Sequence, residues 1–388
     1  MNGDRAVYIK SRNVLINNEL RPATLHFHQG KIKEILPYES LADHDYEDYY
    51  IVPGFIDLHL HGMYGADSLD MTEGALGVIQ QKLLEEGTTS FLATSTTLEK
   101  ETLKVSLKKL ASEIELQTEG EGATCLGIHL EGPFLNSEFA GAHKKEEILK
   151  PSVSVFETLQ EASNNKIRRV TLAPEADDDN ELTTYLSDKG ILVSIGHTAA
   201  TAKETEIAIS AGAKLITHMY NGMPQIHHRE IGVAGMAMLS DEITCEFIAD
   251  GIHVSHRAVE LAKKSKGVQN MILVTDSNKA KGLPPGDYTF NGRNIVLNER
   301  GEARIKETGS LAGSTAKMND IVRNVIENTT IDQVEAFQMA SLNPARLINI
   351  DHYKGQIQTD YDADIVVLDG QYSVIHTYIS GELKEVIP

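Results

Sequence analysis

Short apolar runs that resemble β-strands alternate with amphipathic runs that resemble α-helices over most of this chain. The strand-like runs cover residues 55–61, 88–95, 123–131, 167–175, 191–197, 213–220, 244–250 and 271–276. Helical runs such as 76–87, 101–114 and 255–265 lie between them. This alternation is typical of repeated βα units, and eight parallel strands are enough to close a barrel. The sequence therefore predicts an α/β fold, a (β/α)8 TIM-like barrel.

Strand-like alternation also marks both ends of the chain, at residues 6–36 and again at 363–383. A barrel uses about 250 residues, and this chain has 388. Neither end alone offers enough strands for a stable sheet. We therefore predict one small β-sandwich domain built from residues 1–52 and 349–388, with the barrel, residues 53–348, inserted between its two parts.

The net charge limits the classes of partner. It is −20 at pH 7, which disfavours nucleic acid and anionic membranes because both are bound through basic patches. A small phosphorylated substrate stays possible, since backbone N–H groups and one or two cations can hold it.

Two features predict a cytoplasmic location. The first residues are polar, and no apolar stretch approaches the roughly 20 residues that cross a bilayer. Cys125 and Cys245 lie in apolar runs, where a thiol is more often core filling than a disulfide or a metal ligand.

Metal-binding side chains stand where several predicted strands end. They are His59, His61, Glu131, His197 and His218. Histidines two apart on a strand point to one face and can ligate one ion, and a carboxylate can bind one ion or bridge two. Singly, each has an ordinary structural explanation, as a hydrogen-bonded histidine or a capping carboxylate. Because parallel strands end at one mouth of a barrel, the set together predicts a divalent metal site.

Asp276 ends the last predicted strand and is the candidate acid–base group. A carboxylate beside a metal-activated water can accept its proton and pass it to a departing nitrogen, although an N-cap role is the alternative. His253 follows the run 244–250 and either contacts the substrate carbonyl or is a solvated loop histidine. We expect His129, two residues before Glu131, to lie deeper in the barrel and not to ligate the metal.

Three long connections follow strand ends, at residues 132–150, 220–242 and 277–314. The last contains a predicted hairpin at 288–305 and precedes helices near 316–328 and 332–348. Loops at this end of a barrel usually carry the active site.

Two loop segments are weaker candidates for ligand binding. Asn221 and Gly222, with Arg229 in the same loop, could hold an anion, or could form an ordinary turn beside a surface arginine. The segment 311–314 could close over a ligand or simply lead into a helix.

Several motifs in this chain resemble a known family. The segment 53–62, PGFIDLHLHG, resembles the opening of the amidohydrolase superfamily. Further motifs resemble, more narrowly, the N-acetylglucosamine-6-phosphate deacetylase family. They are HLEGPF (129–134), GHT (196–198), THMYNGM (217–223), REIGVAG (229–235), DGIHV (250–254), VTDS (274–277) and GSLAGS (309–314). They occur in order between Pro53 and Pro344, and the terminal β segments also suit that family.

The resemblance assigns roles to individual residues. It implies that Glu131, His197 and His218 ligate the metal and that Asp276 is the catalytic acid–base residue. It also implies substrate contacts by Ala142, Asn221, Gly222, Arg229, His253, Leu311, Ala312 and Gly313. We add the neighbouring His143 to these candidate contacts, although a loop histidine would by itself be expected to face solvent.

The resemblance also implies an assembly and a cofactor. The arginine that matches Arg229 reaches the phosphate of the neighbouring subunit in that family, which implies a homodimer. Some members replace the first histidine of the pair by glutamine and hold one ion. This chain keeps His59 and His61, so one or two divalent ions are expected, with Glu131 bridging if there are two. Nitrogen and oxygen ligands suit Zn, Fe, Mn or Co alike.

The expected reaction is metal-dependent hydrolysis of the N-acetyl group of N-acetylglucosamine 6-phosphate. Three alternatives stay open at this point. One is the same reaction on the galactosamine epimer. The second is another cyclic-amide or dipeptide amidohydrolase, whose bridging lysine is not evident here. The last is a non-catalytic barrel used for binding, which would be expected to lack some of the ligands that this chain has.

Overall fold

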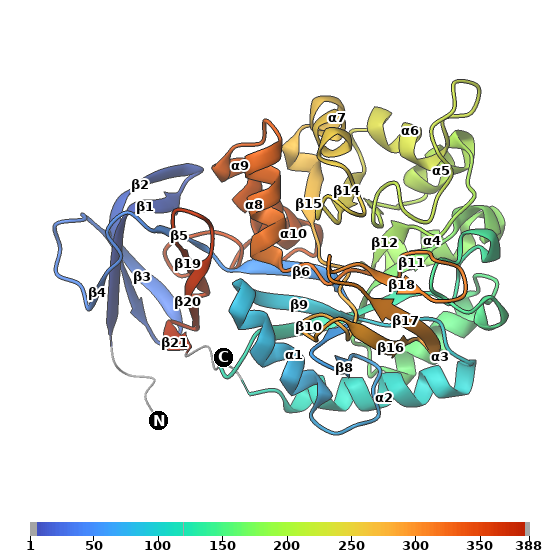
Figure 1. Cartoon of the computed structure of the whole chain (residues 1–388), viewed down its shortest axis with the longest axis horizontal. Helices are drawn as coiled ribbons and strands as arrows, with labels where there is room; N and C mark the ends of the chain where they lie inside the picture. The colour runs from blue at the N-terminus through green and yellow to red at the C-terminus, as the bar shows by residue number, and fades with distance from the viewer. Residues whose placement is uncertain (1–5, 119, 385–388) are drawn as a thin grey trace.

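The computed structural model describes residues 6–118 and 120–384. Within them, eight parallel strands form one sheet in the order β15-β14-β13-β12-β11-β10-β9-β6. The bounds are β6 Phe55–Leu60, β9 Thr88–Thr94, β10 Thr124–Glu131, β11 Ile167–Leu172, β12 Leu192–Ile195, β13 Leu215–Ile216, β14 Thr244–Phe247 and β15 Met271–Leu273. The predicted α/β barrel is confirmed, since each predicted run contributes one strand (Figure 1).

The sheet closes just beyond the ends of its first and last strands. The N–H of Asp276 donates to the carbonyl of His59 at 2.8 Å, and the N–H of His61 donates to the carbonyl of Ser277 at 2.8 Å. Leu60 and Ser277 form a parallel bridge at the same place. The closure therefore brings the first predicted ligands next to Asp276, although more than 200 residues separate them in sequence.

The helices bury one apolar stripe each against the barrel. In α2, for example, Leu103, Leu107, Leu110 and Ile114 are buried at helical spacing, and the Glu99 side chain caps its first turn. The bounds are α1 Ala75–Leu83, α2 Lys100–Leu116, α3 Val153–Ala162, α4 Glu181–Asp188, α5 Ala202–Ser210, α6 Gly232–Leu239, α7 His256–Lys266, α8 Met318–Asn328, α9 Gln333–Ala340 and α10 Leu342–Leu347.

Strands from both ends of the chain form a second sheet, in the order β21-β20-β19-β5-β1-β2-β3, with β4 beside β1. The bounds are β1 Val7–Ile16, β2 Glu19–His28, β3 Lys31–Leu36, β4 His44–Asp45, β5 Tyr50–Pro53, β19 Ile365–Leu368, β20 Val374–Ile379 and β21 Glu382–Lys384. Figure 1 shows the N-terminal and C-terminal strands side by side, next to the barrel.

The second sheet encloses its own core. The N–H of Ile32 donates to the carbonyl of Tyr361 at 2.9 Å, so the β3 edge returns to the segment before β19. Ile9, Phe27 and Ile365 are buried inside. A β-rich region built from both ends of the chain is thus confirmed, while the division into residues 1–52 plus 349–388 and 53–348 stays a prediction.

The connection after β15 contains a small antiparallel sheet of β16 Gly286–Phe290, β17 Arg293–Leu297 and β18 Ala303–Ile305. The predicted hairpin is confirmed, with one further strand. A two-stranded sheet, β7 Gly62–Met63 and β8 Ala66–Asp67, follows β6.

Two predictions about the cysteines and the membrane can be compared with the described residues. Cys125 and Cys245 are buried and unpaired, which confirms that they fill the core. None of the helices in the described ranges is long and apolar enough to span a membrane.

Candidate metal centre

The predicted ligands converge at the carboxyl ends of the barrel strands. His59 lies on β6 with His61 just after it, Glu131 ends β10, and the others follow β12, β13 and β15 within three residues. His197, His218 and Asp276 have positive φ angles of 47°, 30° and 47°. Residues other than glycine rarely adopt this conformation, and it is concentrated at functional sites. At these three positions it turns the chain away from the strand while the side chain stays at the mouth of the barrel.

Glu131 lies at the centre of the cluster. Its Oε1 is 3.4 Å from His59 Nε2, 3.3 Å from His197 Nε2 and 3.2 Å from His218 Nε2. Its Oε2 is 3.2 Å from His61 Nε2 and 3.3 Å from His143 Nε2. One oxygen of this carboxylate therefore contacts three imidazoles, and the other oxygen contacts two.

The spacing of these atoms fits a divalent cation. Donor atoms about 2.0–2.1 Å from a tetrahedral ion lie roughly 3.3 Å apart, and the contacts to Glu131 span 3.2–3.4 Å. His59 Nε2 and Glu131 Oε1 are buried without a hydrogen-bond partner, which is costly unless a further group satisfies them. Donors of His59, His61 and Asp276 lie within 4.8 Å of one another. The chemistry and spacing of the cluster therefore suit a bound metal ion.

Hydrogen bonds on the far side of three imidazoles orient them for such a role. His59 Nδ1 contacts Glu246 Oε1 at 2.7 Å. His197 Nδ1 and His218 Nδ1 contact the carbonyls of Phe139, at 2.7 Å, and Asn221, at 3.1 Å. Carbonyls and carboxylates only accept, so each Nδ1 carries the hydrogen and each Nε2 presents a lone pair to the centre.

His143 has the opposite arrangement. Its Nδ1 accepts a hydrogen bond from the N–H of Thr97 at 3.2 Å, so in the neutral ring the hydrogen is on Nε2 and points to Glu131. Burial lowers the pKa of His143 to about 4, which keeps the ring neutral near pH 7. His143 is thus a hydrogen-bond donor and not a metal ligand. The expectation that it would face solvent is wrong, because the 132–150 connection folds it over Glu131, with 5% of the residue exposed.

The electrostatics of the cluster favour a cation. Burial opposes ionisation of Glu131, yet the charge of His59 and the hydrogen bond that His143 donates hold its pKa well below its ordinary value. Burial would also lower the pKa of His61, but Asp276 and Glu131 raise it to about 9. The negative field that favours a proton on His61 equally favours a metal ion between that ring and the carboxylates.

A cavity of about 360 Å³ opens above the cluster. Most of the predicted substrate contacts line it, namely Ala142, His143, Asn221, Gly222, His253, Leu311 and Gly313. The Nδ1 of His253 contacts Asp250 Oδ2 at 2.7 Å, while its Nε2 is buried without a partner. The Nδ1–H therefore donates to Asp250, and the Nε2 lone pair is available to accept a hydrogen bond from a ligand.

Three of the residues considered from sequence lie elsewhere. Ala312 is fully buried in the core under β16–β18 and does not line the cavity, because the strand alternation turns its side chain away. Arg229 is exposed and lies outside the cavity of its own chain. His129 is buried beneath Glu131, with its Nε2 2.7 Å from Thr171 Oγ1, as expected for a residue deeper in the barrel.

Sequence reasoning missed several residues that line the cavity. They are Thr96, Gly141, Phe290, Asn291, Arg304 and Ser310. Arg304 is the one arginine among the described lining residues. Phe290 packs edge-on against His61, with 5.4 Å between the ring centroids. The Asn291-Gly292 pair is a hairpin signal in the sequence, and it marked a turn without indicating that the turn would cover this cavity.

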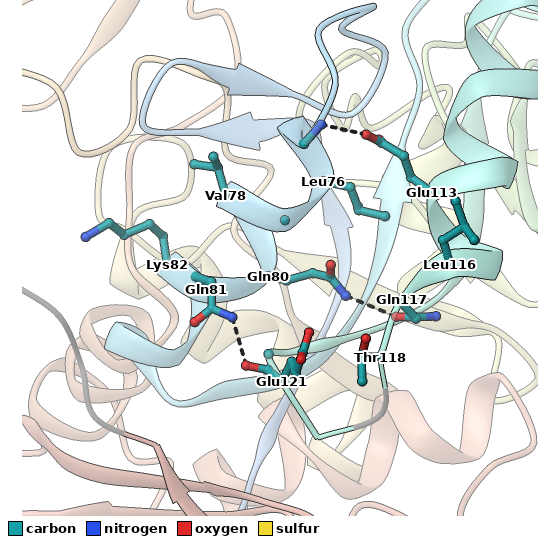
Figure 2. A pocket seen from close by; sticks show the side chains of 13 residues that line it. Leu76, Val78, Gln80, Gln81, Lys82, Glu113, Leu116, Gln117, Thr118 and Glu121 are labelled. Atoms are coloured by element: carbon teal, nitrogen blue, oxygen red, sulfur yellow. Dashed lines mark hydrogen bonds between the residues drawn. The ribbon is translucent and has the colours of Figure 1, made fainter.

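A larger hollow of about 630 Å³ lies between α1 and α2 and shares no lining residue with this cavity (Figure 2). Its polar side chains bond across the two helices. Gln80 donates to Gln117, Gln81 donates to the carbonyl of Glu121, and Glu113 accepts from the N–H of Gly74. No histidine or cysteine is among its described lining residues. The smaller, more enclosed cavity is therefore the candidate active site.

Known proteins resemble the chain over nearly its whole length. The amidohydrolase family profile matches residues 50–384. An N-acetylglucosamine-6-phosphate deacetylase of Bacillus subtilis (strain 168) is 38% identical, covering 97% of each chain. An N-acetylgalactosamine-6-phosphate deacetylase of Escherichia coli O157:H7 is 34% identical, covering 92% of this chain and 94% of its own. The structure of a point mutant of N-acetyl-D-glucosamine-6-phosphate deacetylase from Mycobacterium smegmatis, in complex with N-acetyl-D-glucosamine-6-phosphate, has a TM-score of 0.92 at 29% identity, and the match covers 97% of this chain and 99% of that chain.

Proposed function

The chain belongs to the amidohydrolase family, and from that premise we propose that it hydrolyses the N-acetyl group of N-acetylglucosamine 6-phosphate to give glucosamine 6-phosphate and acetate. The observation that carries the proposal is the Glu131 carboxylate, which four candidate ligand histidines surround at 3.2–3.4 Å beneath a cavity of sugar size. The deacetylase relatives that match this chain over nearly their full length support it.

His59, His61, Glu131, His197 and His218 are the proposed metal ligands. A divalent ion held by them supplies Lewis-acid chemistry, because it polarises an amide carbonyl and makes water a stronger acid. The choice among Zn, Fe, Mn and Co, and between one ion and two, belongs to this proposal. Glu131 is within 3.4 Å of His59 and His61 as well as of His197 and His218, so it would be able to contribute to an ion held by either pair of histidines.

Asp276 is the proposed acid–base residue. Its Oδ1 lies 3.2 Å from His61 Nε2 and 3.4 Å from His59 Nε2, at the floor of the cavity. Burial would raise its pKa, but the two neighbouring imidazoles hold the pKa below its ordinary value. Asp276 is therefore ionised near pH 7 and can accept the proton of the attacking water. It then gives that proton to the leaving amine.

The other cavity residues bind and orient the substrate in this proposal. His253 Nε2 can accept a hydroxyl or amide hydrogen, and His143 can donate from Nε2. The side chain of Asn221 and the backbone near Gly222, Leu311 and Gly313 line the walls. Ala312 contributes through its position between two of these wall residues and not through its own side chain.

A panel of acetylated sugars tests the substrate. We expect acetate release with a kcat/KM that is highest for N-acetylglucosamine 6-phosphate, lower for its galacto epimer and lowest for the unphosphorylated sugar. Loss of a charge-assisted phosphate contact costs about 1.5–3 kcal/mol, or roughly 10- to 100-fold. A higher kcat/KM for the galacto epimer would replace the proposed substrate by that epimer, which the Escherichia coli relative makes the second candidate. No release from any of them would contradict the proposed function.

A homodimer in which Arg229 reaches the phosphate in the neighbouring subunit is also part of the proposal. Arg229 is exposed and lies outside its own cavity. Ile226, in the same loop, is 47% exposed, and Ile252 is 37% exposed after β14. Exposed apolar side chains in two loops at this end of the barrel are what an interface near the active site would cover.

Mixing two inactive or weakened variants tests this arrangement. Arg229→Met is expected to raise KM for the phosphorylated sugar roughly 10- to 100-fold with little change in kcat, because the charged contact is uniform binding. Arg323→Met, on the outer helix α8, is the control and should leave KM unchanged. When Arg229→Met is mixed with an Asp276→Asn variant and the subunits exchange, the mixed dimers should contain one active site with a normal KM. That site combines the intact Asp276 of one subunit with the intact Arg229 of the other. Simple averaging of the two activities would show that Arg229 acts within its own subunit.

A cytoplasmic location completes the proposal. The two cysteines support it, because they are buried and unpaired, as thiols are in a reducing compartment.

A further inference from the structure

A buried ion pair lies in the barrel interior beneath the metal centre. Arg169 on β11 and Glu246 on β14 are both fully buried, and Arg169 Nη1 is 2.6 Å from Glu246 Oε2. Neither residue lines the cavity. A charge pair in a barrel core is expensive to desolvate, and apolar residues of similar size often serve stability equally well. The pair therefore calls for an explanation other than stability.

The guanidinium group of Arg169 forms hydrogen bonds to residues on or next to the strands that carry candidate metal ligands. Arg169 donates to the carbonyl of Leu58 at 3.0 Å, to Thr217 Oγ1 at 3.1 Å and to Ser194 Oγ at 2.9 Å. These three residues precede His59, His218 and His197 in sequence. The guanidinium group thus contacts the residues directly before His59 and His218 and a residue three positions before His197.

Glu246 reaches the ligands themselves. Its Oε1 accepts a hydrogen bond from His59 Nδ1 at 2.7 Å and another from the N–H of His218 at 3.0 Å. Arg169 holds the other oxygen, so the carboxylate cannot rotate without losing one of these partners. A single oxygen therefore fixes the ring of one candidate ligand and the backbone of another.

The two halves of the centre depend on this carboxylate unequally. Backbone carbonyls orient the rings of His197 and His218. In the half formed by His59, His61 and Asp276, His61 Nδ1 is buried without a hydrogen-bond partner. Glu246 is thus the group that orients a ring in that half. Removing it would disturb the ring orientation of one half and leave both ring contacts of the other half intact.

We propose that Glu246, held in place by Arg169, is a positioning residue that decides whether an ion occupies the half formed by His59, His61 and Asp276. This inference rests on the proposed metal centre and deepens it. With Glu246 in place the chain holds two ions. Without its charge the chain holds one, between Glu131, His197 and His218.

Glu246→Gln is the most direct variant, because it keeps the size of the side chain and removes one acceptor. In the wild type, the two carboxylate oxygens of Glu246 accept hydrogen bonds from Arg169, from His59 and from the N–H of His218. The amide has one acceptor oxygen. If that oxygen faces Arg169, the amide N–H₂ faces His59 and the N–H of His218. If it faces His59, the N–H₂ faces Arg169. In either orientation a buried donor meets a donor, which loosens His59 or frees the group that holds it.

The measurement is a Zn²⁺ titration of the metal-free full chain against a competing chelator, with ions per chain counted by elemental analysis. Wild type is expected to bind two ions. In Glu246→Gln the ion at His59, His61 and Asp276 should bind about 10- to 100-fold more weakly, as for other outer partners of metal ligands. The other ion should be weakened less, because the His218 ring keeps its own contact to the carbonyl of Asn221. His59→Gln should lose the first ion, and the double variant should lose nothing beyond what the two single variants lose, because Glu246 acts on that ion through His59.

Three results would overturn the inference. They are two ions of wild-type affinity in Glu246→Gln, equal weakening of both ions, and a double variant that binds the remaining ion more weakly than Glu246→Gln does. The melting temperature of each metal-free variant shows whether it is folded. If Glu246→Gln does not fold, Glu246→Asp decides, since it keeps the charge and withdraws the carboxylate. It should weaken the same single ion by about tenfold, and unchanged binding of both ions would contradict the proposal.

The ion count needs no turnover, so this inference and the proposed function can fail separately. Two ions in the wild type with no acetate release would overturn the proposed reaction alone. Acetate release from a wild-type chain that holds one ion would overturn the inference and leave the reaction standing.

Discussion

Glu131→Gln is expected to lose its bound metal and at least about 10³-fold in kcat, because a catalytic ion contributes several kcal/mol to the transition state. Both proposed ion positions share this carboxylate, whose oxygens lie 3.2–3.4 Å from the imidazoles of His59, His61, His197 and His218. The amide replaces a charged acceptor by a neutral group and turns an N–H₂ donor toward rings that must present lone pairs. The other carboxylate of the cluster, Asp276, contacts His59 and His61 and cannot replace that charge beside His197 and His218, so added metal should not restore turnover.

The readouts are metal content and acetate release from the same preparation. Glu138→Gln is the matched control, since Glu138 is exposed on the connection that follows β10 and should keep both properties. A Glu131→Gln protein with a full complement of metal and near-normal turnover would remove Glu131 from the ligand set.

Asp276→Asn is expected to fold and to bind metal, yet to lose about 10³-fold in kcat, within the range that general acid–base groups contribute. Asparagine keeps an oxygen at the position that now lies 3.2 Å from His61 Nε2 and 3.4 Å from His59 Nε2. It cannot accept a proton from water or deliver one to the amine. The KM for the sugar should change little, because the variant alters the reacting proton and not the walls of the cavity.

Asp287→Asn serves as its control, because Asp287 lies on β16 and its side chain is 70% exposed in an ion pair with Lys306. Metal content, the melting temperature and single-turnover acetate release are measured for both. If Asp276→Asn releases acetate at close to the wild-type rate with its metal bound, the assigned role is wrong. Another group would then have to carry the proton.

The sequence predicted the barrel and the convergence of the candidate ligands at one end of it, because both depend on local patterns. An apolar run followed at once by histidine or a carboxylate identifies a strand end, and parallel strands must end together. His59 and Asp276 are adjacent for that reason, through the closure in which Asp276 donates to the carbonyl of His59. Strand alternation likewise predicted a β-rich region that neither end of the chain could form alone.

What the sequence could not predict depends on packing between distant segments. Arg169 and Glu246 stand inside apolar runs, and no local pattern pairs them, since they meet only when β11 and β14 curve around the same barrel interior. His143 looked like a solvated loop histidine because its burial depends on how the 132–150 connection folds over Glu131. Its tautomer, set by the N–H of Thr97, follows from a single backbone contact.

The cavity walls from the 277–314 connection were beyond prediction for a similar reason. The hairpin pattern indicated strands, but the site they cover depends on the direction in which the small sheet folds back. Phe290 and Arg304 therefore line the cavity without any sequence signal. The GSLAGS motif predicted Ala312 as a substrate contact together with Leu311 and Gly313. Alternation along this extended segment instead turns the Ala312 side chain into the core.

A metal-dependent deacetylase is tested by titrating the metal-free protein with a divalent ion while acetate release from N-acetylglucosamine 6-phosphate is followed. We expect no release before metal is added, a rise that follows the ions bound per chain, and a plateau when the centre around Glu131 is filled. We also expect one new primary amine for each acetate. Full acetate release by the metal-free protein, or none from protein whose centre is filled, would contradict a metal-dependent deacetylase.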